Sequence, residues 1–175
     1  SAYLRSGIVQ SARGCHFDCG FCVVPAHSGS RVVLRPIEEV VEDIAGLPYT
    51  TLFYCDENLL FPDETNRAYT RELLHRVVER GLRKDGFMAN YPQFLTAIPD
   101  EDLTLLARAR VRQIYLVAGL KRPLRRELRD KRLLDTMQRM KRHGIRVFAS
   151  FNLGNDEDHE PVEPLIADFC AQTKT

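Results

Sequence analysis

The sequence predicts an α/β fold built on a parallel sheet. Three observations support this prediction: short apolar runs alternate five times with segments of helical periodicity, the connections between them are short, and the run 51–55 is apolar on both faces. Such alternation calls for parallel strands joined by right-handed crossovers. A chain of 175 residues fits a single domain, which we expect to span residues 1–175.

The first half of the chain supplies three of the expected strands, at residues 7–10, 51–55 and, more weakly, 86–90. A helix is expected after Pro36, where proline favours the first turn and apolar residues follow at helical spacing. A second helix should end near Gly81. The segment 23–30 is rich in Pro, Gly and Ser, so we expect it to be a loop.

The second half continues the same pattern. A short helix is expected after Pro99, because acidic residues follow in its first turn, where the helix dipole favours them. The strands of this half are expected at 113–117 and 145–151, and its further helices at 133–140 and 162–169. These elements complete five strand–helix units.

A cluster of cysteines directly after the first strand carries the functional prediction. Cys15, Cys19 and Cys22 follow a C-x3-C-x2-C spacing. Thiolates are the usual ligands of iron–sulfur clusters, and four of them are typical of an electron carrier. Three ligands leave one iron open to bind something else. A zinc site completed by His16 or His27 is the alternative, although no second C-x2-C is present.

The other two cysteines, Cys55 and Cys170, are expected to pack as small apolar groups. Five cysteines without visible pairing favour a reducing compartment. No apolar run of about 18 residues and no secretory leader is visible, so we expect a cytoplasmic protein without membrane contact.

Residues 13–22, including Phe21 just before the third cysteine, resemble the cluster loop of the radical S-adenosylmethionine (radical SAM) superfamily. The resemblance implies a 4Fe–4S cluster whose fourth iron is chelated by the amino and carboxylate groups of S-adenosylmethionine. It also implies an electron supplied by a reductant such as flavodoxin or ferredoxin. Cleavage of the cofactor would give methionine and a 5′-deoxyadenosyl radical that abstracts hydrogen from an unidentified substrate.

The same resemblance implies a partial (β/α) barrel that is open at one edge. Radical SAM barrels have six units, and five are visible here. Because unpaired sheet edges are usually covered, we expect a sixth unit, another domain or another subunit to cover this edge. The alternative is a sheet edge that is unusually exposed.

Ligands of such folds bind at the carboxyl ends of the strands, so residues that follow each strand are expected to face the cluster. The segments 54–58 and 151–158 resemble those of radical SAM proteins that use cobalamin. The resemblance implies that Asp56 and Asn58 hold the methionine end of the cofactor, with Asn152 and Asp156 against adenine and ribose. Loop capping is the alternative for the first pair. Cobalamin itself is expected only in a longer parent protein with a corrinoid domain.

Two features favour a rival function. Residues 116–120 contain no acid, whereas family members usually carry a glutamate there that contacts the cofactor, and a sixth unit is missing. The sequence also departs from the family at His16, which stands where proline is frequent. The rival is a non-catalytic iron–sulfur or zinc protein with a shortened barrel, serving electron transfer or structure.

Charge is unevenly distributed along the chain. Residues 108–146 contain fourteen Lys and Arg against three acids, whereas residues 156–168 contain six acids and no base. The basic region includes arginines after the fourth strand, near the expected cluster mouth. It indicates either a solvated surface or an anionic partner, such as an anionic substrate.

Overall fold

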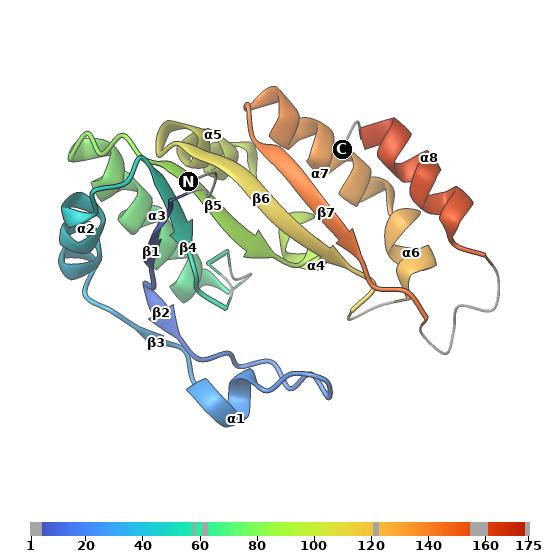
Figure 1. The fold of residues 1–175 in the computed structure, drawn as a ribbon, viewed down its shortest axis with the longest axis horizontal. Helices are drawn as coiled ribbons and strands as arrows, with labels where there is room; N and C mark the ends of the chain where they lie inside the picture. The colour runs from blue at the N-terminus through green and yellow to red at the C-terminus, as the bar shows by residue number, and fades with distance from the viewer. Residues whose placement is uncertain (1–4, 58, 61–62, 121–122, 155–160, 174–175) are drawn as a thin grey trace.

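The centre of the molecule is a parallel five-stranded sheet in the order β1-β4-β5-β6-β7 (Figure 1). The computed structural model describes residues 5–57, 59–60, 63–120, 123–154 and 161–173. The sheet strands are β1 (Gly7–Val9), β4 (Thr51–Tyr54), β5 (Asp85–Asn90), β6 (Val111–Ala118) and β7 (Arg146–Phe151). Every neighbouring pair is parallel, so the five expected strands and their arrangement are confirmed.

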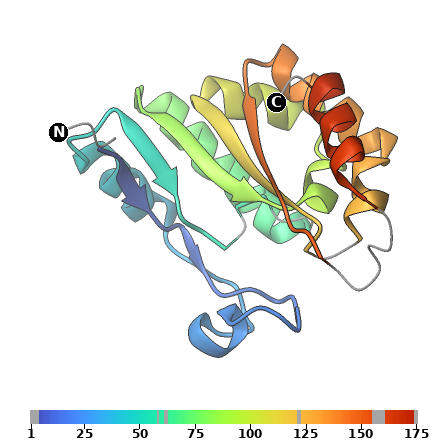
Figure 2. The ribbon, with the colours of Figure 1, turned by 45° about the vertical axis from the view of Figure 1, so that its right-hand side comes forward.

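Helices connect the strands and gather on one side of the sheet (Figures 1 and 2). The connecting helices are α2 (Ile37–Gly46), α3 (Glu64–Glu79), α5 (Asp100–Arg108) and α7 (Lys131–Arg142), and α8 (Glu163–Thr173) follows β7. Two short helices, α4 (Pro92–Leu95) and α6 (Leu124–Leu128), were not expected. Segments of four or five residues are too short to show a helical period, so the sequence carries little signal for them.

The ends of the long helices follow ordinary capping chemistry. The carboxylate of Asp63 accepts from the backbone N–H of Asn66 at 3.0 Å at the start of α3. Gly81, with φ +63°, follows α3 and supplies the left-handed residue that ends a helix. The expected stop at this glycine is therefore confirmed.

The hydrophobic core lies between the sheet and these helices. Alternate strand residues point into it, including Leu52, Met88 and Ile114, each with an exposed fraction of 1% or less. From the helix side, Ile44 and Leu103 are fully buried against them. Burial of this face fixes the register of the sheet, because a slip of one residue would expose every core side chain.

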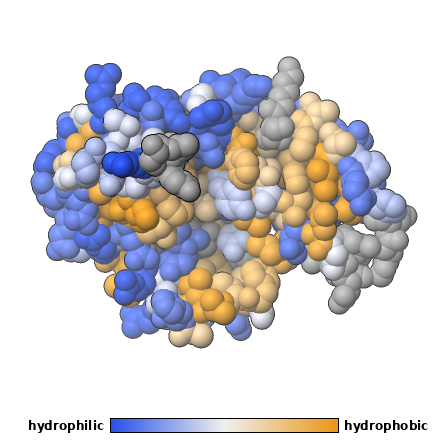
Figure 3. Space-filling view, in the orientation of Figure 1, coloured by the Kyte–Doolittle hydropathy of each residue, from blue (hydrophilic) through white to orange (hydrophobic). Residues whose placement is uncertain are grey.

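The opposite face of the sheet is lined by aromatic side chains. Phe53 stacks on Phe87 with ring centroids 4.6 Å apart, and Tyr115 stacks on Phe148 at 5.6 Å. Phe148 remains 58% exposed. Figure 3 shows hydrophobic residues gathered on this face over β6 and β7. Within the described residues, this face of the barrel is therefore an open apolar surface.

Residues 12–34 form an arm that leaves the sheet after β1. Its base is a two-stranded antiparallel pair, β2 (Ala12–Arg13) with β3 (Val33–Leu34), and its outer part holds the cysteine loop and helix α1 (Val24–Ser28). Figures 1 and 2 show the arm projecting beyond the carboxyl ends of the strands. The expectation of a loop throughout 23–30 was wrong, because Pro25 occupies the first turn of α1, where proline needs no N–H partner.

Candidate functional site

Asp56 holds the base of the arm to the sheet. Its Oδ1 atom accepts hydrogen bonds from the backbone N–H of Ser11 at 2.8 Å, from the Ser11 hydroxyl at 3.0 Å and from the Ala12 N–H at 2.5 Å. The residue is only 6% exposed, and burial raises the pKa of its carboxyl despite these hydrogen bonds. Asp56 therefore turns the chain from β1 into the arm.

Two more side chains complete the arm base. The Tyr69 hydroxyl, from α3, donates towards the carbonyls of Ser11 at 3.1 Å and Arg35 at 2.9 Å. The Arg35 guanidinium donates to the Gln10 carbonyl at 2.9 Å, and it forms an ion pair with Asp43 at 2.8 Å. Both strands of the arm are thus fixed to β1, α2 and α3 where they leave the body of the protein.

Gly14 lets the two sides of the arm approach closely before the first cysteine. It has φ +93°, and a Cβ atom there would lie 2.1 Å from the carbonyl oxygen of Arg31. The next residue, Cys15, donates its backbone N–H to the Gly29 carbonyl at 3.2 Å. Only glycine fits this position without displacing the returning strand.

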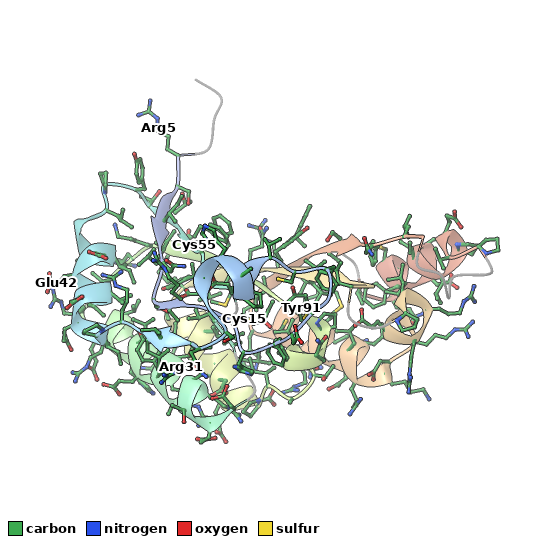
Figure 4. The ribbon with its side chains drawn as sticks, turned by 90° about the horizontal axis from the view of Figure 1, so that it is seen from below. Arg5, Cys15, Arg31, Glu42, Cys55 and Tyr91 are labelled. Atoms are coloured by element: carbon green, nitrogen blue, oxygen red, sulfur yellow. The ribbon has the colours of Figure 1, made fainter. Side chains whose placement is uncertain are left out.

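The three loop cysteines lie near enough to Tyr91 to affect its pKa. Burial is the main cause of the raised Tyr91 pKa, followed by the charges of Cys22, Cys19 and Cys15. Cys15 is 8% exposed, whereas the other two thiols are partly exposed, and none of the five cysteines is in a disulfide. Figure 4 shows Cys15 and Tyr91 close together at the underside of the molecule.

An aromatic group joins the cysteine loop to α4. Phe17 stacks on Phe94 at 5.1 Å, and Phe94 meets Tyr91 edge to face at 5.9 Å. His16 packs on Phe17 at 4.3 Å. These contacts place the outer part of the arm over the carboxyl end of β5, as expected from the position of the cysteines after β1.

The loop supplies three thiols, but the described side chains do not form a ready-made site for a metal ion. Within the described ranges, no three His, Cys, Asp or Glu side chains are arranged to hold one metal ion. His27, the zinc alternative's candidate ligand, is exposed and lies 3.2 Å from the Ser28 hydroxyl. Thiolates are the usual ligands of iron–sulfur clusters, so the chemistry of these three side chains suits such a cluster.

Two buried polar atoms at the strand ends have unused hydrogen-bonding capacity. Asn90, 3% exposed at the end of β5, accepts from the Tyr91 N–H at 2.8 Å, but its Nδ2 atom has no partner among the described residues. The same holds for the Oδ2 atom of Asp56, at the end of the neighbouring strand. Buried polar groups are normally satisfied, so each of these atoms can take a further polar partner.

The ends of β6 and β7 meet at Gly119 and Asn152. Gly119 has φ +81°, and a Cβ atom there would lie 2.7 Å from the Asn152 carbonyl oxygen. The amide of Asn152 donates to the Gly119 carbonyl at 3.3 Å, although the residue itself is exposed. Asn152 thus lies at the carboxyl end of the sheet, where the sequence placed it.

A buried acid near Gly119 was missed from the sequence. Glu127, 2% exposed on α6, accepts from the Gly119 N–H at 2.7 Å. The segment 116–120 at the end of β6 contains no acid, but the short helix α6 after it places the carboxylate of Glu127 beside Gly119. Since α6 was not expected, nothing in the sequence indicated that Glu127 would lie next to Gly119.

The remaining expected site residues are placed as follows. Phe21 is 53% exposed on the outer part of the arm, and Asn58 and Asp156 lie outside the described residues. Among the basic residues after β6, Arg125 donates to the Pro161 carbonyl at 3.1 Å and Arg132 pairs with Asp130 at 3.2 Å. Part of this basic group is therefore engaged within the protein.

Structural comparison identifies the class of fold. The chain superposes on the radical S-adenosylmethionine methyltransferase TsrM from Kitasatospora setae with cobalamin and a [4Fe-4S] cluster bound, with a TM-score of 0.77 and 19% identity over 95% of this chain. The form with tryptophan substrate and a SAM analogue, aza-SAM, gives a TM-score of 0.78 and 20% identity over the same share. The expected partial-barrel α/β fold is confirmed.

The structural match covers only part of the TsrM chains. The chain spans 34% of the length of the TsrM chains. No protein-family model matches this sequence, and no curated protein matches it. None of the described helices is both long and apolar enough to cross a membrane.

Proposed function

We propose that this chain is the core domain of a radical SAM enzyme, in which Cys15, Cys19 and Cys22 bind a 4Fe–4S cluster. The observation that carries the proposal is the position of the loop that holds the three thiols. Through Phe17 stacked on Phe94, this loop lies over the carboxyl end of β5, in a parallel-sheet fold like that of TsrM. When bound, the reduced cluster supplies the electron that cleaves S-adenosylmethionine to methionine and a 5′-deoxyadenosyl radical.

The protein's own part in this function is to hold the thiols and limit water around them. Phe17 and Phe94 pack beside the loop, and Asp56 fixes the point where the arm begins. A site with few donors to sulfur and little solvent favours a low cluster potential, since potentials depend on hydrogen bonding and exposure. Among the aromatic residues that pack beside the loop, Tyr91 is the one that carries a hydroxyl group.

We assign binding of the cofactor to the two buried side chains that have unused hydrogen-bonding capacity. The amide nitrogen of Asn90 can donate to a carboxylate, and the Oδ2 atom of Asp56 can accept from an ammonium group. S-adenosylmethionine carries both groups at its methionine end. Asn58 is assigned to the same end, whereas Asn152, Asp156 and the aromatic Phe21 are assigned to the rest of the cofactor on the resemblance alone.

The open aromatic face of the sheet is the proposed contact surface for the substrate. It lies on the side of the barrel opposite the helices, where Phe148 is 58% exposed. The exposed arginines after β6 favour an anionic group on that substrate. The proposal also includes a reductant such as flavodoxin or ferredoxin, and a sixth unit, domain or subunit that covers the edge of β7.

Anaerobic reconstitution with iron and sulfide tests the proposal. After addition of dithionite and S-adenosylmethionine, we expect 5′-deoxyadenosine, detected by mass spectrometry, and none from the variant with all three loop cysteines replaced by alanine. An intact four-iron spectrum without 5′-deoxyadenosine would instead support a non-catalytic iron–sulfur protein. Purified material that holds only zinc would contradict both assignments.

A further inference from the structure

A pocket at the amino ends of β5 and β6 gathers arginines at the opposite end of the sheet from the cysteine arm. Its rim carries Arg83, Arg108, Arg110 and Arg112, and its floor includes Val78 and Leu82. Figure 3 shows hydrophilic residues along the upper edge of the molecule, where Figure 1 places these strand ends. The proposed chemistry of the arm makes no use of this pocket.

The backbone is shaped to bring two of these arginines together. Arg110 has φ +62° and is the one non-glycine residue with positive φ among those described. The ladder between β5 and β6 then shifts register after Gly86, which pairs with Val111, while Phe87 pairs with Gln113. The shift leaves Arg112 as the extra residue of a bulge, a device that redirects a side chain.

One carboxylate accompanies these arginines. Asp85 lies 2.6 Å from a terminal nitrogen of Arg110 and 3.5 Å from Nε of Arg112. The buried Nε of Arg110 has no hydrogen-bond partner among the described residues. Arg83 and Arg108 are exposed, and no ion pair to a described residue is formed by either. One carboxylate cannot neutralise four guanidinium groups, so the pocket keeps a positive potential.

The neighbouring arginines in and directly after α3 form ion pairs with glutamates. Arg76 pairs with Glu72 at 3.0 Å, and the following Arg80 pairs with Glu42 at 2.8 Å. Arg76 and Arg80 therefore add little to the positive potential of the pocket. Four guanidinium groups around one open pocket suit a compact anion, whereas a polyanion such as RNA is bound along an extended basic surface.

We propose that this arginine pocket binds a phosphate group of a small phosphorylated molecule. The guanidinium group presents its N–H donors in a planar fork that matches phosphate oxygens two at a time. The exposed Arg83 and Arg108 can close on the ligand, and Asp85 holds Arg110 and Arg112 in place beneath it. The apolar floor, with Val78 and Leu82, strengthens these contacts by excluding water from one side.

Calorimetry of the full chain with inorganic pyrophosphate at low ionic strength tests the proposal. We expect saturable binding by one site, weakened about tenfold or more in the double variant Arg83→Ala/Arg108→Ala, because each lost charge-assisted hydrogen bond costs roughly a factor of ten. The control variant Lys141→Ala/Arg142→Ala removes the same charge from exposed residues of α7 and should bind as the parent does. Circular dichroism checks that each variant is folded.

Three results would overturn the phosphate site. The first is the absence of saturable binding by the parent chain. The second is an equal loss of pyrophosphate affinity in the two double variants, which would show that only the net charge of the protein matters. The third is tighter binding of a single-stranded RNA oligonucleotide with the same dependence on Arg83 and Arg108, which would make the surface a nucleic-acid contact.

Discussion

Ser11 and Asp56, which are 45 positions apart in the sequence, are joined by two hydrogen bonds to a single carboxylate oxygen. One comes from the backbone of Ser11 and the other from its hydroxyl, and both residues are buried. This contact ties the start of the arm to the end of β4. It also gives Asp56, which the sequence offered as a cofactor ligand or a loop cap, a structural role within the protein itself.

Replacing Asp56 by alanine should therefore destabilise the fold. The change leaves the buried N–H groups of Ser11 and Ala12 without an acceptor, at a cost of about 2 kcal/mol or more. Asp56→Asn keeps an acceptor oxygen and should lose less. Chemical denaturation of the two variants compares the free energies of unfolding, and an alanine variant as stable as the asparagine variant would contradict this role.

The pH dependence of stability should also change with Asp56. Burial raises the pKa of this carboxyl in the folded chain above its ordinary value of 3.8, so the folded state binds the proton more tightly than the unfolded state. The stabilisation from this group is present below the ordinary pKa and is lost as the pH rises through the folded pKa. Asp56→Asn should remove this decline, measured as the free energy of unfolding from about pH 4 to about pH 7. Parallel curves for the parent and the variant would contradict the shift.

Two glycines of the arm offer a matched test of the close approach before Cys15. Gly14→Ala places a Cβ atom 2.1 Å from the Arg31 carbonyl oxygen at positive φ, and should cost about 1–3 kcal/mol and lower the yield of reconstituted cluster. At Gly20 a Cβ atom would meet nothing within 4 Å. Gly20→Ala should leave stability and yield unchanged, and equal effects of the two changes would argue against the packing described.

The ends of β6 and β7 allow a second comparison at equal backbone conformation. Gly119 and Gly154 have φ of +81° and +82°, but only at Gly119 would a Cβ atom crowd another group, the Asn152 carbonyl at 2.7 Å. Both alanine variants therefore carry the same strain from positive φ, and only Gly119→Ala adds a steric clash. Gly119→Ala should be less stable than Gly154→Ala by about 1–3 kcal/mol. Thermal unfolding of the two variants measures the difference, which should vanish if the strand ends are not in contact.

Single cysteine variants test the proposed cluster ligands. Cys15→Ala, Cys19→Ala and Cys22→Ala should each abolish the visible absorbance of the reconstituted cluster, because a 4Fe–4S cluster with only two thiolates is not held. Cys55→Ala is the control, since this thiol donates to the Val9 carbonyl at 3.3 Å and belongs to the sheet. Retention of full absorbance by any loop variant would remove that cysteine from the ligand set.

The sheet could be predicted from the sequence because most strands contain a short apolar run and alternate with segments of helical periodicity. The run 113–117, for example, lies within β6, and flanking residues extend the strand at both ends. The helices with three or more turns were found by their spacing of apolar residues. Elements without such a period were missed, including α1, α4, α6 and the two-residue strands of the arm.

The candidate site was predictable only in part, for a related reason. Cysteine spacing is local and can be read directly, whereas the stacking of Phe17 on Phe94 joins distant segments of the chain. Glu127 reaches Gly119 through a helix too short to recognise. Single polar residues become part of a site only through tertiary packing, which periodicity does not encode.

Strands β2 and β3 pair with each other and with no strand of the main sheet. A segment built in this way can gain or lose residues between Cys22 and Val33 without shifting any register of the barrel. Length variation in that segment is therefore a route by which the surroundings of the thiols can be altered while the scaffold stays the same.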